Sequence, residues 1–301
     1  MTDPGSNKLD VGGRTGERSA GGAVTLTRLN PREKLRRRRT ARARGGPPDF
    51  VGVGAQRSGT TWWFDLITAH PEVSAPVEKE WHFFNAFCTT EMTDEHLAAY
   101  RSGFQRERGQ IAGEWTPRYA YDFWTPPLLR RAAPEAKLLF LMRDPLARLR
   151  SGIEHQSRLT PPRDAAQFAH IFADAAARGL YGAQLHRLLE HFPREQVLVL
   201  QYEQCVADTR AQLRRTYRYL GIDEDFRPND LRQASEAPRS DRLVPLPAAA
   251  HEAFLRAATA DLVQLVSCAP EIDPALWPTF SGLRAGEGIR TPNPRFTRAG
   301  T

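Results

Sequence analysis

One segment near the start of the chain, residues 49–62, joins a short apolar run to a loop of small residues and the start of a helix. The apolar run 50–53 predicts a buried strand, and the stretch 54–59 predicts a tight loop before a helix that begins at Thr60. Such a loop turns several backbone N–H groups toward one point, and the helix adds the positive end of its dipole. The segment therefore predicts a pocket for a phosphate or sulfate group.

The side chains of this loop add hydrogen-bond donors to those of the backbone. Arg57 carries a permanent positive charge that can bind an anion through two parallel N–H groups. Ser58, Thr60 and Thr61 carry hydroxyls. A loop that binds nucleoside triphosphates requires the pattern GxxxxGK[ST], in which a lysine follows the last glycine. Here the cation precedes Gly59, which disfavours an ATP-dependent small-molecule kinase; we retain the kinase as the alternative hypothesis.

Beyond this loop, short apolar runs alternate with stretches of helical periodicity. The apolar runs predict strands at 50–53, 111–113, 138–142 and 197–200. The periodic stretches predict helices at 60–69, 94–102, 126–132, 146–157, 165–191, 208–220 and 247–266. Strands separated by helices indicate a parallel sheet covered on both faces. The expected fold class is therefore α/β, a P-loop-like three-layer α/β/α architecture with a central parallel sheet, whose ligands bind at the carboxyl ends of the strands.

The two ends of the chain differ in composition from the part between them. Residues 1–47 predict a disordered Arg-rich tail and residues 281–301 a second disordered tail, which leaves 48–280 as one folded domain. The net charge of +7 belongs to the first tail, since residues 1–48 hold 12 basic and 4 acidic side chains. The short arginine run 36–39 is weak evidence for an anionic partner, so we expect no specific nucleic acid. A non-catalytic RNA- or nucleotide-binding protein stays as a second alternative.

Several classes of protein are disfavoured by what the chain lacks. It contains no run of about 18 apolar residues, so no membrane span is expected, and its first ten residues do not resemble a signal peptide. Its three cysteines, Cys88, Cys205 and Cys268, form no CxxC pair, which disfavours a zinc site or a disulfide framework. These features predict a cytoplasmic protein without a bound metal. The oligomeric state is not predicted by any of them.

Two segments together resemble the donor-binding sequences of a known enzyme family. Gln56-Arg-Ser-Gly-Thr-Thr61 is similar to the (Lys/Arg)-(Ser/Thr)-Gly-Thr-Thr loop of the sulfotransferases that use 3′-phosphoadenosine 5′-phosphosulfate (PAPS). Arg143-Asp-Pro145, followed about two helical turns later by Ser151, resembles the 3′-phosphate site of that family. The resemblance implies PAPS as sulfuryl donor, bound by Gln56, Arg57, Ser58, Gly59, Thr60, Thr61, Trp62, Arg143 and Ser151.

A third segment, Lys79-Glu-Trp-His-Phe-Phe84, resembles a sequence of the heparan-sulfate type of sulfotransferase and of related bacterial enzymes. The resemblance implies Glu80 as the catalytic base, and we place Arg57 and His82 in the catalytic set with it. A carboxylate between aromatic side chains is expected to have a raised pKa and to accept a proton from an acceptor hydroxyl or ammonium. Asn85 stands where the heparan-sulfate enzymes often carry Asp.

A fourth segment, Gly113-Glu-Trp-Thr-Pro-Arg-Tyr119, is similar to the substrate loop of the family. Its third residue is a lysine in several glycan sulfotransferases and is Trp115 here. An indole stacks on sugar or aromatic rings but cannot pair with a sulfate or carboxylate. We therefore expect a carbohydrate or small-molecule acceptor that is less anionic than heparan sulfate. The residues expected to contact it are Trp81, His82, Trp115, Thr116, Pro117 and Tyr119.

The resemblance covers roughly residues 48–280 and implies a direct in-line transfer of the sulfuryl group without a metal. Glu80 would take the proton of the acceptor, and Arg57 would stabilise the charge that grows on the leaving phosphate. One donor must then contact both Arg57 and Arg143, so the two should lie at the same edge of the sheet. Residues 238–242 are the candidate for a contact to the adenine side.

Overall fold

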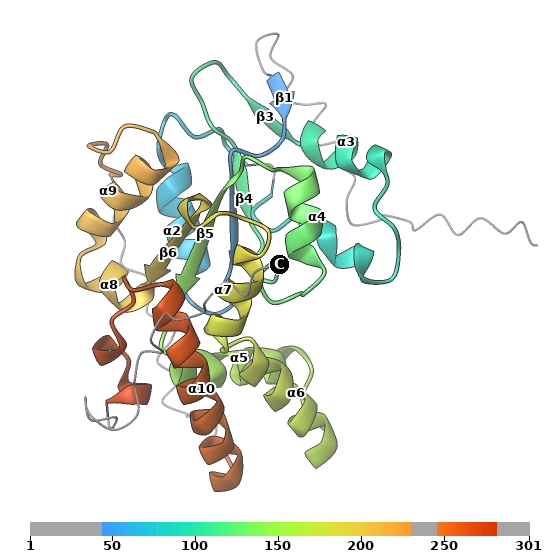
Figure 1. The fold of residues 1–301 in the computed structure, drawn as a ribbon, viewed down its shortest axis with the longest axis vertical. Coiled ribbons are helices and arrows are strands. Elements are labelled where there is room, and N and C mark those ends of the chain that lie inside the picture. The colour runs from blue at the N-terminus through green and yellow to red at the C-terminus, as the bar shows by residue number, and fades with distance from the viewer. Residues whose placement is uncertain (1–43, 77, 230–245, 282–301) are drawn as a thin grey trace, which may run out of the picture.

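The computed structural model of the protein describes residues 44–76, 78–229 and 246–281 (Figure 1). The predicted tail 282–301, residues 1–43 of the other predicted tail, and the candidate adenine-side segment 238–242 lie outside these residues. Within the described ranges, no helix combines the length and the apolar character needed to cross a membrane.

A four-stranded parallel sheet forms the centre of the domain. Its strands, in spatial order, are β4 (Gly113–Trp115), β2 (Phe50–Gly54), β5 (Lys137–Met142) and β6 (Val197–Gln201). The predicted α/β class with a central parallel sheet is confirmed. The strand predicted at 111–113 is displaced, because β4 begins at Gly113 and Ile111 forms only an isolated bridge with Val73.

Both faces of the sheet are buried, because alternate residues of a strand pack on opposite sides. In β5, Leu138, Phe140 and Met142 belong to one hydrophobic cluster, whereas Leu139 and Leu141 belong to the other. A strand that is buried on both sides exposes no side chain to solvent, which is why the sequence is apolar over this whole stretch.

Helices cover each face and complete three layers. One face carries α2 (Thr60–Thr68) and α9 (Thr209–Leu220), and in Figure 1 these lie on one side of the strands with α4 on the other. The opposite cluster includes side chains of α4 (Thr125–Ala132), α5 (Pro145–Leu159), α7 (Tyr181–Leu189) and α10 (Ala248–Cys268). The remaining helical elements are α3 (Asp94–Ser102), α6 (Ala165–Ala177), α8 (Tyr202–Ala207) and the short 3₁₀ turns η1 (Phe83–Cys88), η2 (Arg194–Gln196), η3 (Pro274–Leu276) and η4 (Pro278–Phe280).

The helix predicted over 165–191 is in fact two helices, α6 and α7, that separate at residues 178–180. Gly179 lies in the break and has a low helix propensity. Asp261 of α10 accepts hydrogen bonds from the backbone N–H groups of residues 182–183, at 2.7 and 2.8 Å, and so caps the start of α7. Because this cap comes from a distant part of the chain, local periodicity did not reveal the break.

A small antiparallel sheet extends the domain at its N-terminal side. It pairs β1 (Arg44–Gly46) with β3 (Phe104–Arg106). The prediction that disorder continues as far as Pro47 is therefore wrong for the last residues of that tail. Arg106 holds the segment in place, since its Nε lies 3.1 Å from the Asp49 carboxylate and its guanidinium donates to the Pro47 carbonyl at 3.0 Å.

The carboxyl ends of β2 and β5 meet at one edge of the sheet. β2 leads into the loop 55–59, and β5 leads into Arg143. The Ala55 N–H donates to the Leu141 carbonyl at 2.8 Å, so the loop stays bonded to β5 beyond the end of β2. Two adjacent parallel strands thus deliver the loop and Arg143 to neighbouring positions.

Candidate active site

The loop between β2 and α2 has a backbone shape that few residues permit. Arg57 has a φ of 68° and Gly59 a φ of 87°, both in the left-handed region. A Cβ at Gly59 would lie 2.7 Å from the ring of Tyr202, so only glycine fits there. No side chain caps the start of α2. The first-turn N–H groups, which include those of Thr60 and Thr61, are therefore free of a side-chain cap and suited to an anion.

Arg57 reaches from this loop to α5. Its Nε donates a 3.1 Å hydrogen bond to Oγ of Ser151. Burial lowers the pKa of Arg57, and the positive charges of Arg158 and Arg143 lower it further. Several cations therefore share one edge of the sheet, where a bound anion would relieve their mutual repulsion. The structure brings together Arg57, Arg143 and Ser151, as a single donor would require.

Arg143 follows directly after β5. Its guanidinium carbon lies 5.1 Å from the centroid of the Tyr202 ring, a cation–π contact. Asp144 then caps α5 by accepting a 2.7 Å hydrogen bond from the Ala147 N–H. This cap fixes the direction in which α5 leaves the strand, and so fixes where α5 presents Ser151.

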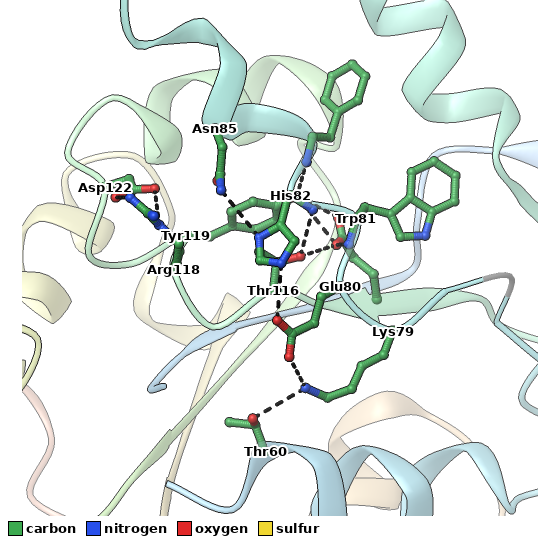
Figure 2. A network of polar contacts seen from close by, with 12 residues as sticks. Thr60, Lys79, Glu80, Trp81, His82, Asn85, Thr116, Arg118, Tyr119 and Asp122 are labelled. Atoms are coloured by element: carbon green, nitrogen blue, oxygen red, sulfur yellow. Dashed lines mark hydrogen bonds and ion pairs between the residues drawn. The ribbon is translucent and has the colours of Figure 1, made fainter. Parts of the chain in front are cut away.

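The predicted base, Glu80, lies between two nitrogen donors (Figure 2). Nζ of Lys79 is 2.6 Å from Oε1 of Glu80, and Nε2 of His82 is 3.3 Å from Oε2. The same Lys79 Nζ donates to Oγ1 of Thr60 at 3.5 Å. Lys79 thus connects the carboxylate to the first residue of α2, which places Glu80 next to the loop predicted to bind an anion.

These contacts decide the charge state of Glu80. Burial raises its pKa, but hydrogen bonds from His82 and Lys79, together with their charges, outweigh burial and hold the pKa below its usual range. The expectation of a raised pKa is therefore wrong, because nitrogen donors, and not the aromatic rings, are the nearest neighbours of the carboxylate. Glu80 is an ionised carboxylate at neutral pH, able to accept a proton.

Five of the six residues predicted to contact the acceptor are buried instead: Trp81, Trp115, Thr116, Pro117 and Tyr119. Nε1 of Trp115 donates to the Gly54 carbonyl at 3.1 Å, and its ring fills the space beside Gly52, where a Cβ would lie 2.0 Å from the indole. The prediction that Trp115 stacks on an acceptor is wrong, and the inference of a weakly anionic acceptor loses its basis. His82, with 47% of its side chain exposed, can still reach an acceptor.

Comparison of the chain with models of known protein families gives a match. The family model described as "Sulfotransferase domain" matches residues 47–256. The chain belongs to the sulfotransferase family. This assignment decides against the kinase alternative.

Among curated relatives, the chain is 30% identical over 186 residues to mouse heparan sulfate glucosamine 3-O-sulfotransferase 3B1, covering 58% of this chain and 46% of the mouse protein. It is 30% identical over 135 residues to the membrane-associated sulfotransferase kil1 of Dictyostelium discoideum, covering 43% and 28% of the two chains. This sulfotransferase therefore spans about half or less of the length of these relatives.

A solved structure supports the fold. The sulfotransferase from Alicyclobacillus acidocaldarius superposes with a TM-score of 0.60 at 24% identity, covering 76% of this chain and 98% of the other. At this level of identity the likeness speaks for the sulfotransferase architecture alone.

Three residues predicted to bind the sulfuryl donor have different surroundings. Ser58 is turned into the protein, since its N–H donates to the Ala55 carbonyl at 3.2 Å and its side chain is fully buried. Its predicted contact with the donor is therefore corrected. Gln56 contributes a carbonyl that accepts from Arg148 at 3.4 Å. Trp62, in the first turn of α2, packs edge-on against Tyr202, with ring centroids 6.1 Å apart.

The structure also adds residues that the sequence analysis did not assign to the site. Burial lowers the pKa of His155, the charges of Arg57 and Arg158 lower it further, and the charge of Glu80 opposes them. His155 and Arg158 of α5 therefore lie within electrostatic reach of the reacting groups. Their spacing of four and seven residues after Ser151 was the available signal, because such residues share one face of a helix. The sequence around Tyr202 carried no pattern that would have indicated its place beside the loop and Arg143.

Proposed function

We propose that this chain transfers the sulfuryl group of PAPS to a hydroxyl or amine of an acceptor. The observation that carries the proposal is the junction of Arg57 with Ser151 beside the uncapped start of α2, at the same sheet edge as Arg143. Two anion-binding positions next to each other suit a donor that carries a phosphosulfate at one end and a 3′-phosphate at the other.

The chain's own groups fit this donor. The N–H groups at the start of α2, with the hydroxyls of Thr60 and Thr61, would hold the phosphosulfate, and Arg57 would neutralise it. Arg143 and Ser151 would hold the 3′-phosphate, which ATP lacks. Gly59 supports the fit, because its left-handed backbone, with the Tyr202 ring packed where a Cβ would lie, sets the shape of the loop before α2.

In the proposed reaction, an acceptor oxygen or nitrogen forms a bond to sulfur while sulfur breaks its bond to the bridging oxygen of the phosphosulfate. The acceptor proton passes to Glu80, and 3′-phosphoadenosine 5′-phosphate (PAP) leaves with the charge of that oxygen. Arg57 and Lys79 lie beside the start of α2, where this charge develops. Positioning and electrostatic stabilisation therefore supply the catalysis.

The acceptor class follows from the groups around Glu80. Lys79 and His82 contact the carboxylate, and His155 of α5 lies within electrostatic reach of both Glu80 and the cation Arg158. Such surroundings favour an acceptor that carries an anionic group next to its nucleophile. Together with the names of the curated relatives, this favours the hydroxyl or amine of an acidic carbohydrate.

Ligand-induced thermal stabilisation tests the proposal. PAP at about 100 times its dissociation constant would stabilise the protein by about 2.7 kcal/mol. ATP at the same concentration should give a clearly smaller shift, because it has no 3′-phosphate for Arg143 and Ser151. Labelled PAPS and a panel of carboxylated or N-sulfated oligosaccharides would then test transfer. Equal shifts with PAP and ATP, or no shift with PAP, would overturn the assignment of the donor.

A further inference from the structure

Three successive backbone N–H groups near the proposed base, those of residues 81–83, all donate to side chains of the segment 114–119 (Figure 2). The first donates to Oε2 of Glu114 at 3.2 Å, the second to Oγ1 of Thr116 at 3.3 Å, and the third to the Tyr119 hydroxyl at 3.1 Å. The backbone beside Glu80 is therefore held by side chains and not by a strand or helix ladder.

All three acceptors meet at one carboxylate. The Thr116 hydroxyl donates to Oε2 of Glu114 at 2.7 Å, and the Tyr119 hydroxyl donates to Oε1 at 3.2 Å. The Tyr100 hydroxyl adds a 2.7 Å bond to Oε1. Each hydroxyl has a single proton, so one that accepts from a backbone N–H must give its proton to the carboxylate. Both oxygens of Glu114 therefore act only as acceptors.

The segment under this control is strained. His82 has a φ of 50°, in the left-handed region that non-glycine residues rarely occupy. Such a conformation persists only where surrounding contacts enforce it. Because Nε2 of His82 bonds to Glu80, the backbone angle of His82 sets the position of a hydrogen bond to the base.

Glu114 is fully buried, and burial raises its pKa. Among the residues that the structure describes, the contacts of this carboxylate are with neutral donors: three hydroxyls and one backbone N–H. A buried carboxylate without a cationic partner costs stability, which an amide or an apolar side chain would avoid. Its presence next to the base segment points to a role in function.

We propose that Glu114 is a positioning residue of the transfer reaction, which orders residues 81–83 and thereby holds His82 against Glu80. This inference rests on the proposed role of Glu80 as the base. Glu114 does not touch donor or acceptor, since it acts through Thr116 and Tyr119. A buried carboxylate thus determines the position of the hydrogen bond between His82 and the base.

Glu114→Gln is the sharpest test, because it keeps the shape of the side chain and replaces one acceptor oxygen with a donor. The hydroxyls that now face an NH₂ group must turn, and they release the backbone N–H groups they accept. Amide hydrogen exchange of residues 81–83, measured on the whole chain, should become about 10- to 100-fold faster. The acid limb of the pH profile of transfer should also move to higher pH, since His82 then lowers the pKa of Glu80 less.

Asp261→Asn provides a matched control. Asp261 is another largely buried carboxylate that accepts from two successive backbone N–H groups, and burial raises its pKa as well. Its amide variant should speed exchange at residues 182–183 and leave both residues 81–83 and the pH profile as in the wild type. If Glu114→Gln does not fold, Thr116→Val serves instead, because it keeps the carboxylate and removes the hydroxyl that joins the His82 N–H to Glu114.

The inference is overturned if Glu114→Gln, or Thr116→Val in its place, leaves exchange at 81–83 and the acid limb unchanged, or speeds exchange equally throughout the protein. Hydrogen exchange needs neither donor nor acceptor. A wild type that fails to bind PAP would therefore count against the proposed function, while the exchange result alone decides whether Glu114 orders the segment.

Discussion

Arg57 and Ser151, 94 positions apart in the sequence, are joined by a 3.1 Å hydrogen bond from Nε to Oγ. The bond ties the loop after β2 to the second turn of α5. The two residues were assigned to different phosphates of one donor, and the bond shows that these two assignments border each other in space. Substitutions on either side of this junction should therefore affect one ligand.

Replacing Arg57 with alanine removes the loop cation that is proposed to stabilise the leaving group. We expect turnover with PAPS to fall by about 100- to 1,000-fold, the loss typical for one transition-state donor. Steady-state kinetics with labelled PAPS would measure it. Arg256→Ala, the same change at a side chain of α10 that is 73% exposed, should leave the rate as it is. An unchanged rate in Arg57→Ala would remove Arg57 from the mechanism.

Glu80→Gln separates binding from chemistry. The amide keeps the size of the side chain but cannot take a proton from the acceptor. PAP should bind with nearly wild-type affinity, as measured by calorimetry, while transfer falls by about 100-fold or more. Loss of PAP binding and of transfer to the same degree would mean that Glu80 supports the fold and is not the base.

The pH dependence of transfer should respond to Lys79. The base works when it is ionised, so activity is lost as the pH falls through the pKa of Glu80, which Lys79 and His82 hold below its usual range. Lys79→Met removes one hydrogen bond and one charge, so that pKa rises and the acid limb moves to higher pH. A profile whose acid limb stays in place, measured at saturating donor, would contradict the assignment of the limb to Glu80.

Gly59 and Gly109 form a natural pair for testing the loop. They have almost the same φ, 87° and 86°, but a Cβ would meet the Tyr202 ring at 2.7 Å in Gly59 and nothing within 4 Å in Gly109. Both alanine variants should lose about 1–2 kcal/mol from left-handed strain. Gly59→Ala should lose more stability in urea unfolding and should also weaken PAP binding. Equal losses in the two variants would mean that the ring moves away without cost.

Trp115→Ala should act on stability and not on the choice of acceptor. The indole is fully buried beside Gly52, and truncation of such a side chain costs about 3–5 kcal/mol. Phe123→Ala, at a side chain that is 67% exposed, should change the unfolding free energy by no more than about 0.5 kcal/mol. A stable Trp115→Ala protein with altered acceptor preference would restore the role first predicted for the ring.

The sequence predicted the strands and helices whose formation depends mainly on apolar runs and helical periodicity. The strands β2, β5 and β6 and the helix α3 were predicted to within about one residue, because apolar runs and helical periodicity are written in consecutive residues. The break between α6 and α7 was missed, because the cap that stabilises the start of α7 is supplied by Asp261, far along the chain.

The site shows the same division. The loop before α2 and the place of Arg143 at the end of β5 were predicted from their motifs, since glycine spacing and a cation after an apolar run are local features. The burial of Trp115 depends on the strand register, which sets this residue opposite Gly52 in β2. The lowered pKa of Glu80 depends on the side-chain conformations of Lys79 and His82, which both donate to the carboxylate. These conformations cannot be read from the identity of the neighbouring residues.

The two positions proposed to bind the phosphates of the donor follow directly after β2 and β5, which are neighbours in the sheet. Adjacent strands are spaced about 4.8 Å apart by backbone hydrogen bonds, whatever their side chains. The main chain therefore sets the distance between the two ends of a ligand that contacts both positions. Substitutions of side chains can change the affinity for each end of that ligand, but they leave this distance unchanged as long as the sheet is retained.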